Sequence, residues 1–225
     1  MKDGTPVIIF YDTFYCPWSY AYEKYHIEHS CLIIGINNND LCCIDPNITS
    51  EIKTFDYNDF ANAVIKHATL KINLSNIPVI DWRGILKQSA LKMINKNGHN
   101  CPTDEMIVFA NEISKMDVHT EILIYKEIWG SPLFRKISFI GQGRMNFSKY
   151  LKYLYKEYKI ELIRCFYEKI EEIGRNWYKI RLMVIRIPML ENREQHLKLM
   201  AEKINEIACM EKNLALDIFC RVNDL

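Results

Sequence analysis

The chain has 225 residues, 49% of them hydrophobic and 12% aromatic, which excludes the composition of a disordered protein. Its 29 basic and 28 acidic side chains give a formal net charge of +1, so no global field favours nucleic acid as a partner. No signal-peptide pattern opens the sequence, and no apolar run is long enough to cross a bilayer. We therefore expect a cytoplasmic protein with neither nucleic-acid nor membrane partners.

The first third of the chain predicts a compact β-rich unit. Residues 6–12 predict a buried strand from their β-branched and aromatic content, and residues 13–28 predict a loop crowded with aromatic side chains. Residues 29–46 predict a hairpin, because the four Asn and Asp residues at 37–40 tolerate the positive φ of a tight turn. A surface connection that ends in a short strand is expected over 47–54, and a helix capped by Asp56 over 56–67.

The remaining chain predicts helices, because apolar residues recur at spacings of three and four. The expected helices cover residues 84–97 (with Asn97-Gly98 as C-cap), 101–116, 117–129, 133–158, 160–187 and 191–220. The predicted fold class is therefore α+β, with an antiparallel β unit over 1–75 and an all-helical domain over 79–225.

One pair of residues in the hairpin carries catalytic chemistry. His29 begins the first strand and Asp45 follows the second, so the antiparallel pairing brings them side by side although they are sixteen residues apart. A carboxylate beside an imidazole fixes its tautomer and orients it as a base, which supplies two members of a nucleophilic triad. The alternative is a core histidine next to an ordinary Asp-Pro turn.

Cysteine and histidine spacing does not favour metal binding. The eight cysteines are expected to be reduced thiols, and none forms a Cys-x-x-Cys pair. His26 and His29 are three residues apart, but they precede a strand and have no third ligand nearby, so we expect neither a metal nor a cofactor. Cys16-Pro17-Trp18-Ser19 follows a strand and is similar to a single-cysteine thioredoxin site, which leaves a redox protein as an alternative.

Residues 5–22, the His26-Ile27-Glu28-His29 segment and the hairpin up to Asp45-Pro46 resemble the N-terminal-domain family of butirosin biosynthesis protein H. The resemblance covers the C-terminal part of that papain-like domain, and residues 79–220 are similar to the family's helical second domain. It implies a cysteine acyltransferase or hydrolase that acts on carrier-bound acyl thioesters or peptides in secondary-metabolite biosynthesis. It also implies His29 as general base and Asp45 as its orienting partner, with substrate-binding residues Tyr15, Trp18, Tyr20 and His26.

The nucleophilic cysteine of the family has no counterpart in this sequence. Cys16 falls in the aromatic loop and Cys31 inside a strand, and neither is expected at a helix N-terminus. We therefore expect no turnover by the chain alone. Three interpretations stay open: a truncated reading frame, a split enzyme whose cysteine comes from a separate chain, or a non-catalytic relative. Without the family's N-terminal helices, one sheet face would be left apolar and uncovered, which favours a partner chain or a homodimer. A further alternative is a non-catalytic module whose aromatic loop binds a peptide or a carrier protein.

Overall fold

The structure, a computed structural model, describes residues 5–46, 48–49, 51–69, 80–94 and 101–222. The chain divides into two compact units, Met1–Val79 and Ile80–Leu225, which we call the β unit and the helical unit. The first contains a five-stranded antiparallel sheet and the second consists, in its described residues, of helices and turns, so the predicted α+β class is confirmed. None of the described helices combines the length and apolarity needed to span a membrane.

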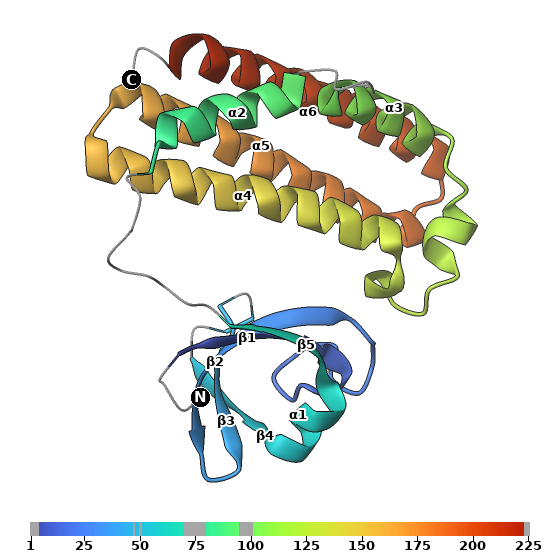
Figure 1. The fold of residues 1–225 in the computed structure, drawn as a ribbon. Coiled ribbons are helices and arrows are strands. Elements are labelled where there is room, and N and C mark those ends of the chain that lie inside the picture. Colours follow the sequence, from blue (N-terminus) through green and yellow to red (C-terminus); the bar gives the residue numbers. More distant parts are fainter. Residues whose placement is uncertain (1–4, 47, 50, 70–79, 95–100, 223–225) are drawn as a thin grey trace. The chain divides into compact units, whose positions relative to one another are not determined.

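The sheet of the β unit has the strand order β4-β3-β2-β1-β5. Its strands are β1 (Val7–Asp12), β2 (Glu28–Asn37), β3 (Asp40–Ile44), β4 (Ile52–Asp56) and β5 (Val64–Thr69) (Figure 1). A 3-10 turn, η1 (Thr13–Tyr15), follows β1, and helix α1 (Tyr57–Ala63) lies between β4 and β5. His29, near the start of β2, pairs with Tyr11 of β1 and lies just before the part of β2 that pairs with β3.

The predicted hairpin is confirmed. Asn37 pairs with Asp40 across the turn, and Asn38 adopts the left-handed conformation with φ 55° that a tight hairpin requires. Cys43 pairs with Ile33, so the hairpin register carries the chain to Asp45 beside the first residues of β2.

The helix predicted over residues 56–67 is wrong in its second half. Asp56 does cap α1, since its carboxylate accepts hydrogen bonds from the backbone amides of Asn58 and Asp59. The helix ends at Ala63, however, and Val64–Thr69 forms the edge strand β5 against β1. The β-branched residues of this segment suit a strand, and pairing with it supplies hydrogen bonds to a β1 edge that a helix would leave unpaired.

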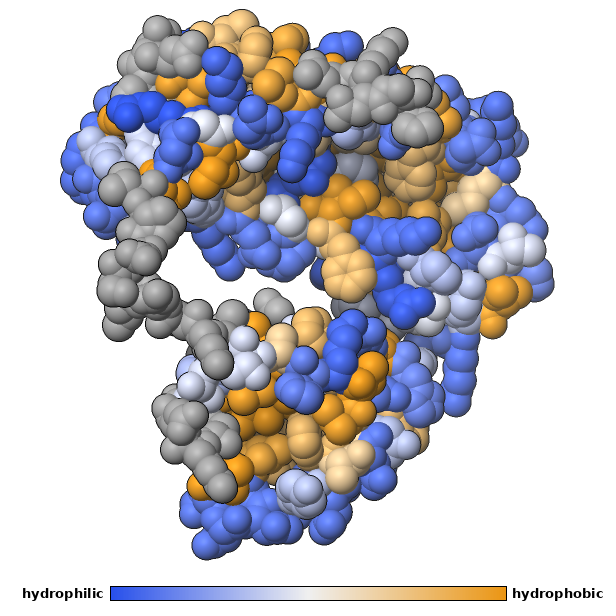
Figure 2. Space-filling model, viewed as in Figure 1, coloured by the Kyte–Doolittle hydropathy of each residue, from blue (hydrophilic) through white to orange (hydrophobic). Residues whose placement is uncertain are grey.

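One face of the sheet forms the core of the β unit. Alternate residues of the strands are buried there, among them Ile9, Cys31, Ile33, Leu41 and Phe55. The opposite face also carries apolar residues, and Ile44 and Ile52 are exposed there, with Ile52 at 62%. Figure 2 shows hydrophobic residues gathered on the visible side of this unit.

The helical unit consists mainly of long helices. These are α2 (Trp82–Ile94), α3 (Pro102–Ser114), α4 (Pro132–Tyr158), α5 (Glu161–Arg186) and α6 (Arg193–Arg221). Helix α5 packs against both α4 and α6, and α2 and α3 lie along α6 (Figure 1). The predicted helices over 84–97, 101–116, 133–158, 160–187 and 191–220 thus correspond to observed ones, although the predicted Asn97-Gly98 cap lies outside the described residues.

The prediction of a helix over residues 117–129 is wrong. This segment contains a single π-helical turn, η3 (His119–Leu123), and a 3-10 turn, η4 (Ile128–Gly130). Two side chains hold the irregular backbone: the Asp117 carboxylate accepts from the His119 amide, and the Ser131 hydroxyl donates to the Glu121 carbonyl. Ser131 is also the N-cap of α4, because its hydroxyl accepts a hydrogen bond from the Phe134 amide. The irregular segment therefore ends where α4 begins.

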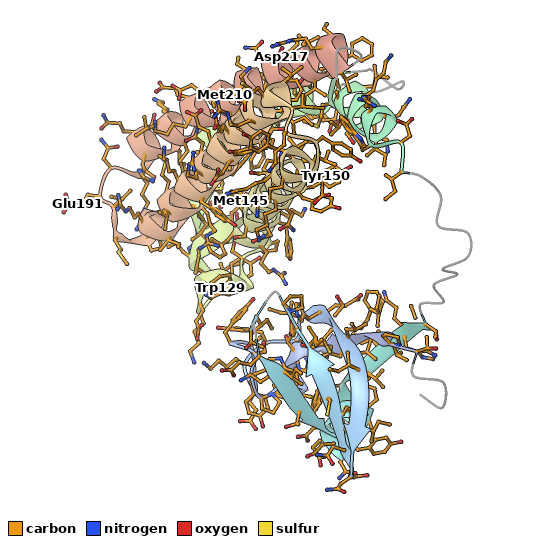
Figure 3. All side chains as sticks on the ribbon, turned by 90° about the vertical axis from the view of Figure 1, so that its left-hand side faces the viewer. Trp129, Met145, Tyr150, Glu191, Met210 and Asp217 are labelled. Carbon is orange, nitrogen blue, oxygen red and sulfur yellow. The ribbon has the colours of Figure 1, made fainter. Side chains whose placement is uncertain are left out.

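Helix α5 supplies the central stripe of the helical core. Its buried residues recur every three or four positions, as the sequence predicts: Ile163, Phe166, Ile170, Ile173, Trp177, Ile180 and Val184. Two glycines bring α4 and α5 close together. A Cβ at Gly141 would lie 3.3 Å from the Cβ of Trp177, and one at Gly174 would lie 2.7 Å from Sδ of Met145, which Figure 3 labels on α4.

A third helical glycine, Gly143, has no such packing role, because a Cβ there would meet nothing within 4 Å. We predict that Gly143→Ala stabilises the helical unit by about 1 kcal/mol through helix propensity. The matched change Gly174→Ala should destabilise it by about 1–3 kcal/mol, since Met145 must leave its position. Urea unfolding followed by circular dichroism at 222 nm measures both, and equal effects of the two substitutions would contradict this account.

Candidate functional site

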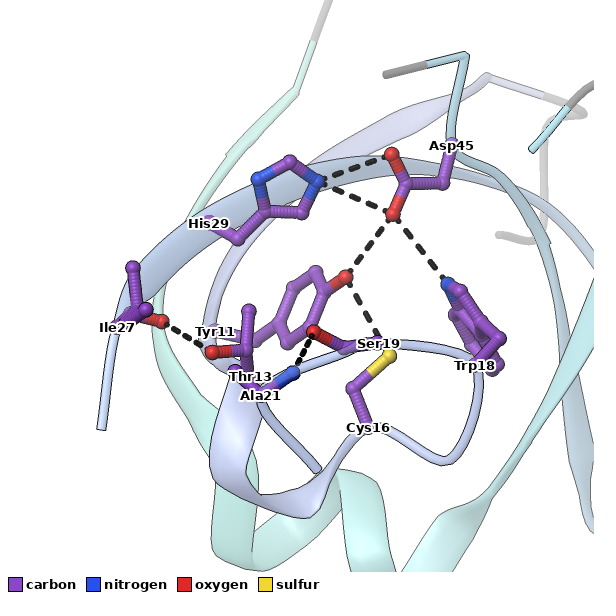
Figure 4. Close-up of polar contacts among 9 residues, drawn as sticks. All are labelled: Tyr11, Thr13, Cys16, Trp18, Ser19, Ala21, Ile27, His29 and Asp45. Atoms are coloured by element: carbon purple, nitrogen blue, oxygen red, sulfur yellow. Dashed lines mark hydrogen bonds and ion pairs between the residues drawn. The ribbon is translucent and has the colours of Figure 1, made fainter. Parts of the chain in front are cut away.

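A fully buried carboxylate, Asp45, is the centre of the candidate site (Figure 4). Its Oδ1 and Oδ2 lie 2.9 and 3.1 Å from Nε2 of His29. Oδ2 also accepts hydrogen bonds from the Tyr11 hydroxyl at 3.1 Å and from Nε1 of Trp18 at 3.3 Å. The predicted contact between His29 and Asp45 is therefore confirmed, while a catalytic role for the pair stays a prediction.

The loop between β1 and β2 is held in place by its own polar contacts. The backbone amide and hydroxyl of Thr13 both donate to the carbonyl of Ile27, at 3.0 and 3.1 Å, which closes the loop at its base. Inside it, the Ser19 hydroxyl accepts from the Ala21 amide. Trp18 packs edge-on against Phe55 of the core, so its indole N–H points to Asp45 from a fixed position.

The hydrogen-bond network assigns the tautomer of His29. The Asp45 carboxylate oxygens are acceptors, so Nε2 of His29 carries the hydrogen and Nδ1 is the basic nitrogen. Among the described residues Nδ1 has no hydrogen-bond partner, and the His29 side chain is 21% exposed. The site therefore presents an oriented imidazole with one accessible basic nitrogen.

Tyr11 contacts both His29 and Cys16, the cysteine of the aromatic loop. Its ring meets that of His29 edge-on with centroids 5.6 Å apart, and its hydroxyl lies 3.6 Å from Sγ of Cys16. Burial raises the pKa of the Tyr11 phenol well above its usual range, and the neighbouring Cys16 and Asp45 act in the same direction. Tyr11 therefore remains a protonated donor to Asp45 at any physiological pH. The sequence pattern predicts only a strand at Tyr11, although a phenol facing a core needs an acceptor.

Cys16 does not have the environment of a reactive thiol. It is fully buried and follows η1 rather than beginning a helix. Burial raises its pKa to about 11, so the thiol keeps its proton at neutral pH. These properties disfavour the thioredoxin-like alternative.

The other predicted substrate-binding residues have different positions. Tyr15 is partly buried against the β-unit core, and Tyr20 is 52% exposed. His26 forms a separate pair, with Nδ1 2.6 Å from the Asp12 carboxylate and its ring stacked on Phe14. Among the four predicted residues, Trp18 is the one for which a hydrogen bond to Asp45 is observed, and that contact gives it a structural role.

The pair formed by His26 and Asp12 differs from the central one in its exposure. The side chains of His26 and Asp12 are 68% and 20% exposed, whereas those of His29 and Asp45 are 21% and 0% exposed. Desolvation, the largest single influence, raises the pKa of Asp12, but hydrogen bonds from His26 and from the amides of Phe14 and Ile27 outweigh it and leave that pKa below its ordinary value. Solvent screens this surface pair, so it lacks the fixed environment of the His29 site.

The described residues contain no group of three or more His, Cys, Asp or Glu side chains placed to bind a metal ion. What the site offers is an imidazole oriented by a buried carboxylate, which suits proton transfer to or from a nucleophile. Neither a scan against protein-family models nor a search of curated proteins found a match to the sequence.

Removing the central carboxylate should cost more than removing the imidazole. We predict that Asp45→Ala destabilises the β unit by about 3 kcal/mol, because Tyr11 and Trp18 lose an acceptor in a buried setting. His29→Ala should cost only about 1 kcal/mol, since its side chain is partly exposed and the carboxylate keeps two donors. Native-state hydrogen exchange of the β2 amides measures both values, and a larger effect of His29→Ala would contradict the assigned network.

The thiols should differ in their rates of alkylation. We predict that iodoacetamide at pH 8 modifies the exposed Cys165, Cys209 and Cys220 in the native protein and leaves Cys16 intact. The native state favours the protonated form of Cys16, so its modification should rise only as the pH approaches about 11. Peptide mass spectrometry after timed quenching measures the order, and early labelling of Cys16 would restore the redox alternative.

Proposed function

We propose that His29 and Asp45 form the base half of a nucleophilic centre for acyl transfer, completed by a cysteine thiol from a separate segment or chain. The observation that carries the proposal is the bond from Nε2 of His29 to the buried Asp45 carboxylate, which leaves Nδ1 accessible. In this arrangement Nδ1 takes the proton of an incoming thiol and later returns it to the leaving group.

The proposed reaction has two steps. The thiolate attacks the carbonyl of an acyl thioester or peptide, forming a new thioester and releasing the original thiol or amine, which takes the proton from His29. An amine or water then attacks the carbonyl of the new thioester and gives its proton to His29. The carbon–sulfur bond breaks, the amide or acid is released, and the cysteine thiolate takes the proton back from His29. The resemblance to the butirosin biosynthesis protein H family supports carrier-bound acyl or peptidyl groups as substrates and secondary-metabolite biosynthesis as the setting.

The position of His29 restricts how the thiol can approach. His29 lies two residues before the buried Cys31 and four before the buried Ile33, so all three side chains are on the core-facing side of the sheet. His29 is only partly buried, so it is reached at the edge of that side. Ile44 and Ile52 are exposed on the other face, where Ile44 pairs with both Leu32 and Ile52. We propose that the partner chain, or a second copy of this one, covers this apolar face as well.

The test supplies the thiol from solution. We predict that the chain alone does not hydrolyse S-acetyl-N-acetylcysteamine above background. With 2-mercaptoethanol added, it should accelerate acyl exchange, and His29→Ala should lower that protein-dependent rate at least about tenfold because the positioned base is lost. Chromatography of the two thioesters over time gives the rates.

The matched control is His67→Ala, which removes an exposed histidine of the edge strand β5 in the same unit. This variant should retain the full exchange rate. An equal loss in both variants would mean unspecific imidazole catalysis, and an unchanged rate in His29→Ala would refute the proposed base.

A further inference from the structure

The helical unit contains a cavity that is independent of the His29 site. Its volume is about 220 Å³, and helices α2, α4, α5 and α6 line it. Most of the lining side chains are apolar, including Met93, Phe147, Ile170, Leu214 and Ile218. A cavity of this composition suits an apolar molecule, with specificity coming from the few polar groups in its wall.

The polar side chains in the wall are Ser89 and an ion pair. Nε and Nη2 of Arg144 donate to the two carboxylate oxygens of Glu211 at 2.9 and 2.7 Å. Nε1 of Trp177 donates to Oε1 of the same carboxylate at 3.0 Å. The Glu211 side chain is 2% exposed and has both oxygens occupied, so the pair is rigid and its net charge is zero.

Arg144 nevertheless retains a donor for a ligand. Its Nη1 has no hydrogen-bond partner in the described part of the chain, and the side chain is 27% exposed where it lines the cavity. Because Glu211 already balances the guanidinium charge, a second carboxylate would meet repulsion from Glu211 and a ligand cation would meet repulsion from Arg144. An uncharged acceptor, such as a carbonyl oxygen, meets neither.

Gly143 gives the independent second observation. Gly141 and Gly174 are explained by the close approach of α4 and α5, but a Cβ at Gly143 would touch nothing, and this residue lines the cavity. A glycine inside a helix is unfavourable by about 1 kcal/mol relative to alanine, and here no packing requirement offsets it. Gly143 is exposed at the edge of the cavity, so a larger side chain at this position has room to cover the space beside Arg144.

We propose that this cavity is a binding site for a neutral, apolar small molecule with one amide carbonyl, whose oxygen accepts a hydrogen bond from Arg144 Nη1. The apolar part of the molecule lies against the side chains of α5 and α6, and the carbonyl lies at the ion pair.

Three probes with hydrocarbon chains of five or six carbons and different head groups test this proposal on the full chain. N-hexylacetamide is neutral, hexanoate is an anion and hexylamine is a cation at pH 7. Isothermal titration calorimetry should show saturable binding of N-hexylacetamide, with hexanoate and hexylamine at least about tenfold weaker. No binding of N-hexylacetamide up to its solubility limit, or equal affinity for all three probes, would overturn the proposal.

Three variants locate the site. Gly143→Leu places a side chain in the cavity and should abolish binding, and a melting temperature no lower than that of the parent chain shows that it is folded. Lys149→Leu adds the same side chain to an exposed position of α4 outside the cavity and should bind N-hexylacetamide normally. Arg144→Lys keeps the charge opposite Glu211 but removes Nη1, so it should weaken binding about tenfold. Unchanged binding by folded Gly143→Leu would place the probe elsewhere and refute the site.

Discussion

The β unit depends on the hydrogen bonds that converge on the Asp45 carboxylate. Donors reach it from β1, from the aromatic loop and from the start of β2, through Tyr11, Trp18 and His29. A buried carboxylate without donors would be strongly unfavourable, so each of these elements has one position that satisfies it. The requirement that stabilises this part of the fold is therefore the same one that orients the imidazole.

The two histidine–carboxylate pairs of the β unit show why distance is a poor guide to chemistry. The pair of His26 with Asp12 is the shorter, at 2.6 Å against 2.9 Å for His29 with Asp45. In the surface pair both side chains contact solvent, which screens their attraction and lets the imidazole turn. In the other pair the carboxylate is sealed in the core, and this difference in solvation makes His29 the better candidate for proton transfer.

The features that could be predicted from the sequence are those with a regular spacing of apolar residues or with contacts between residues close in the chain. The spacing of apolar residues predicted α5, and the polar turn predicted the hairpin that joins His29 to Asp45. The prediction failed at Val64–Thr69, where pairing with a distant strand outweighed the local helical pattern. It also overlooked the donor role of Tyr11, because the Tyr11–Asp45 contact spans 34 positions and no local pattern records it.

The crossing of α4 and α5 restricts how these helices can move. The Cβ of Trp177 on α5 packs against Gly141 on α4. One turn further along α4, the side chain of Met145 packs against Gly174 on α5, so each helix places a large side chain over a glycine of the other. A slip by one turn, about 5.4 Å, would set a large side chain where the opposite backbone has no gap. The pair can therefore splay at its ends or twist about this crossing, but it cannot slide along its length.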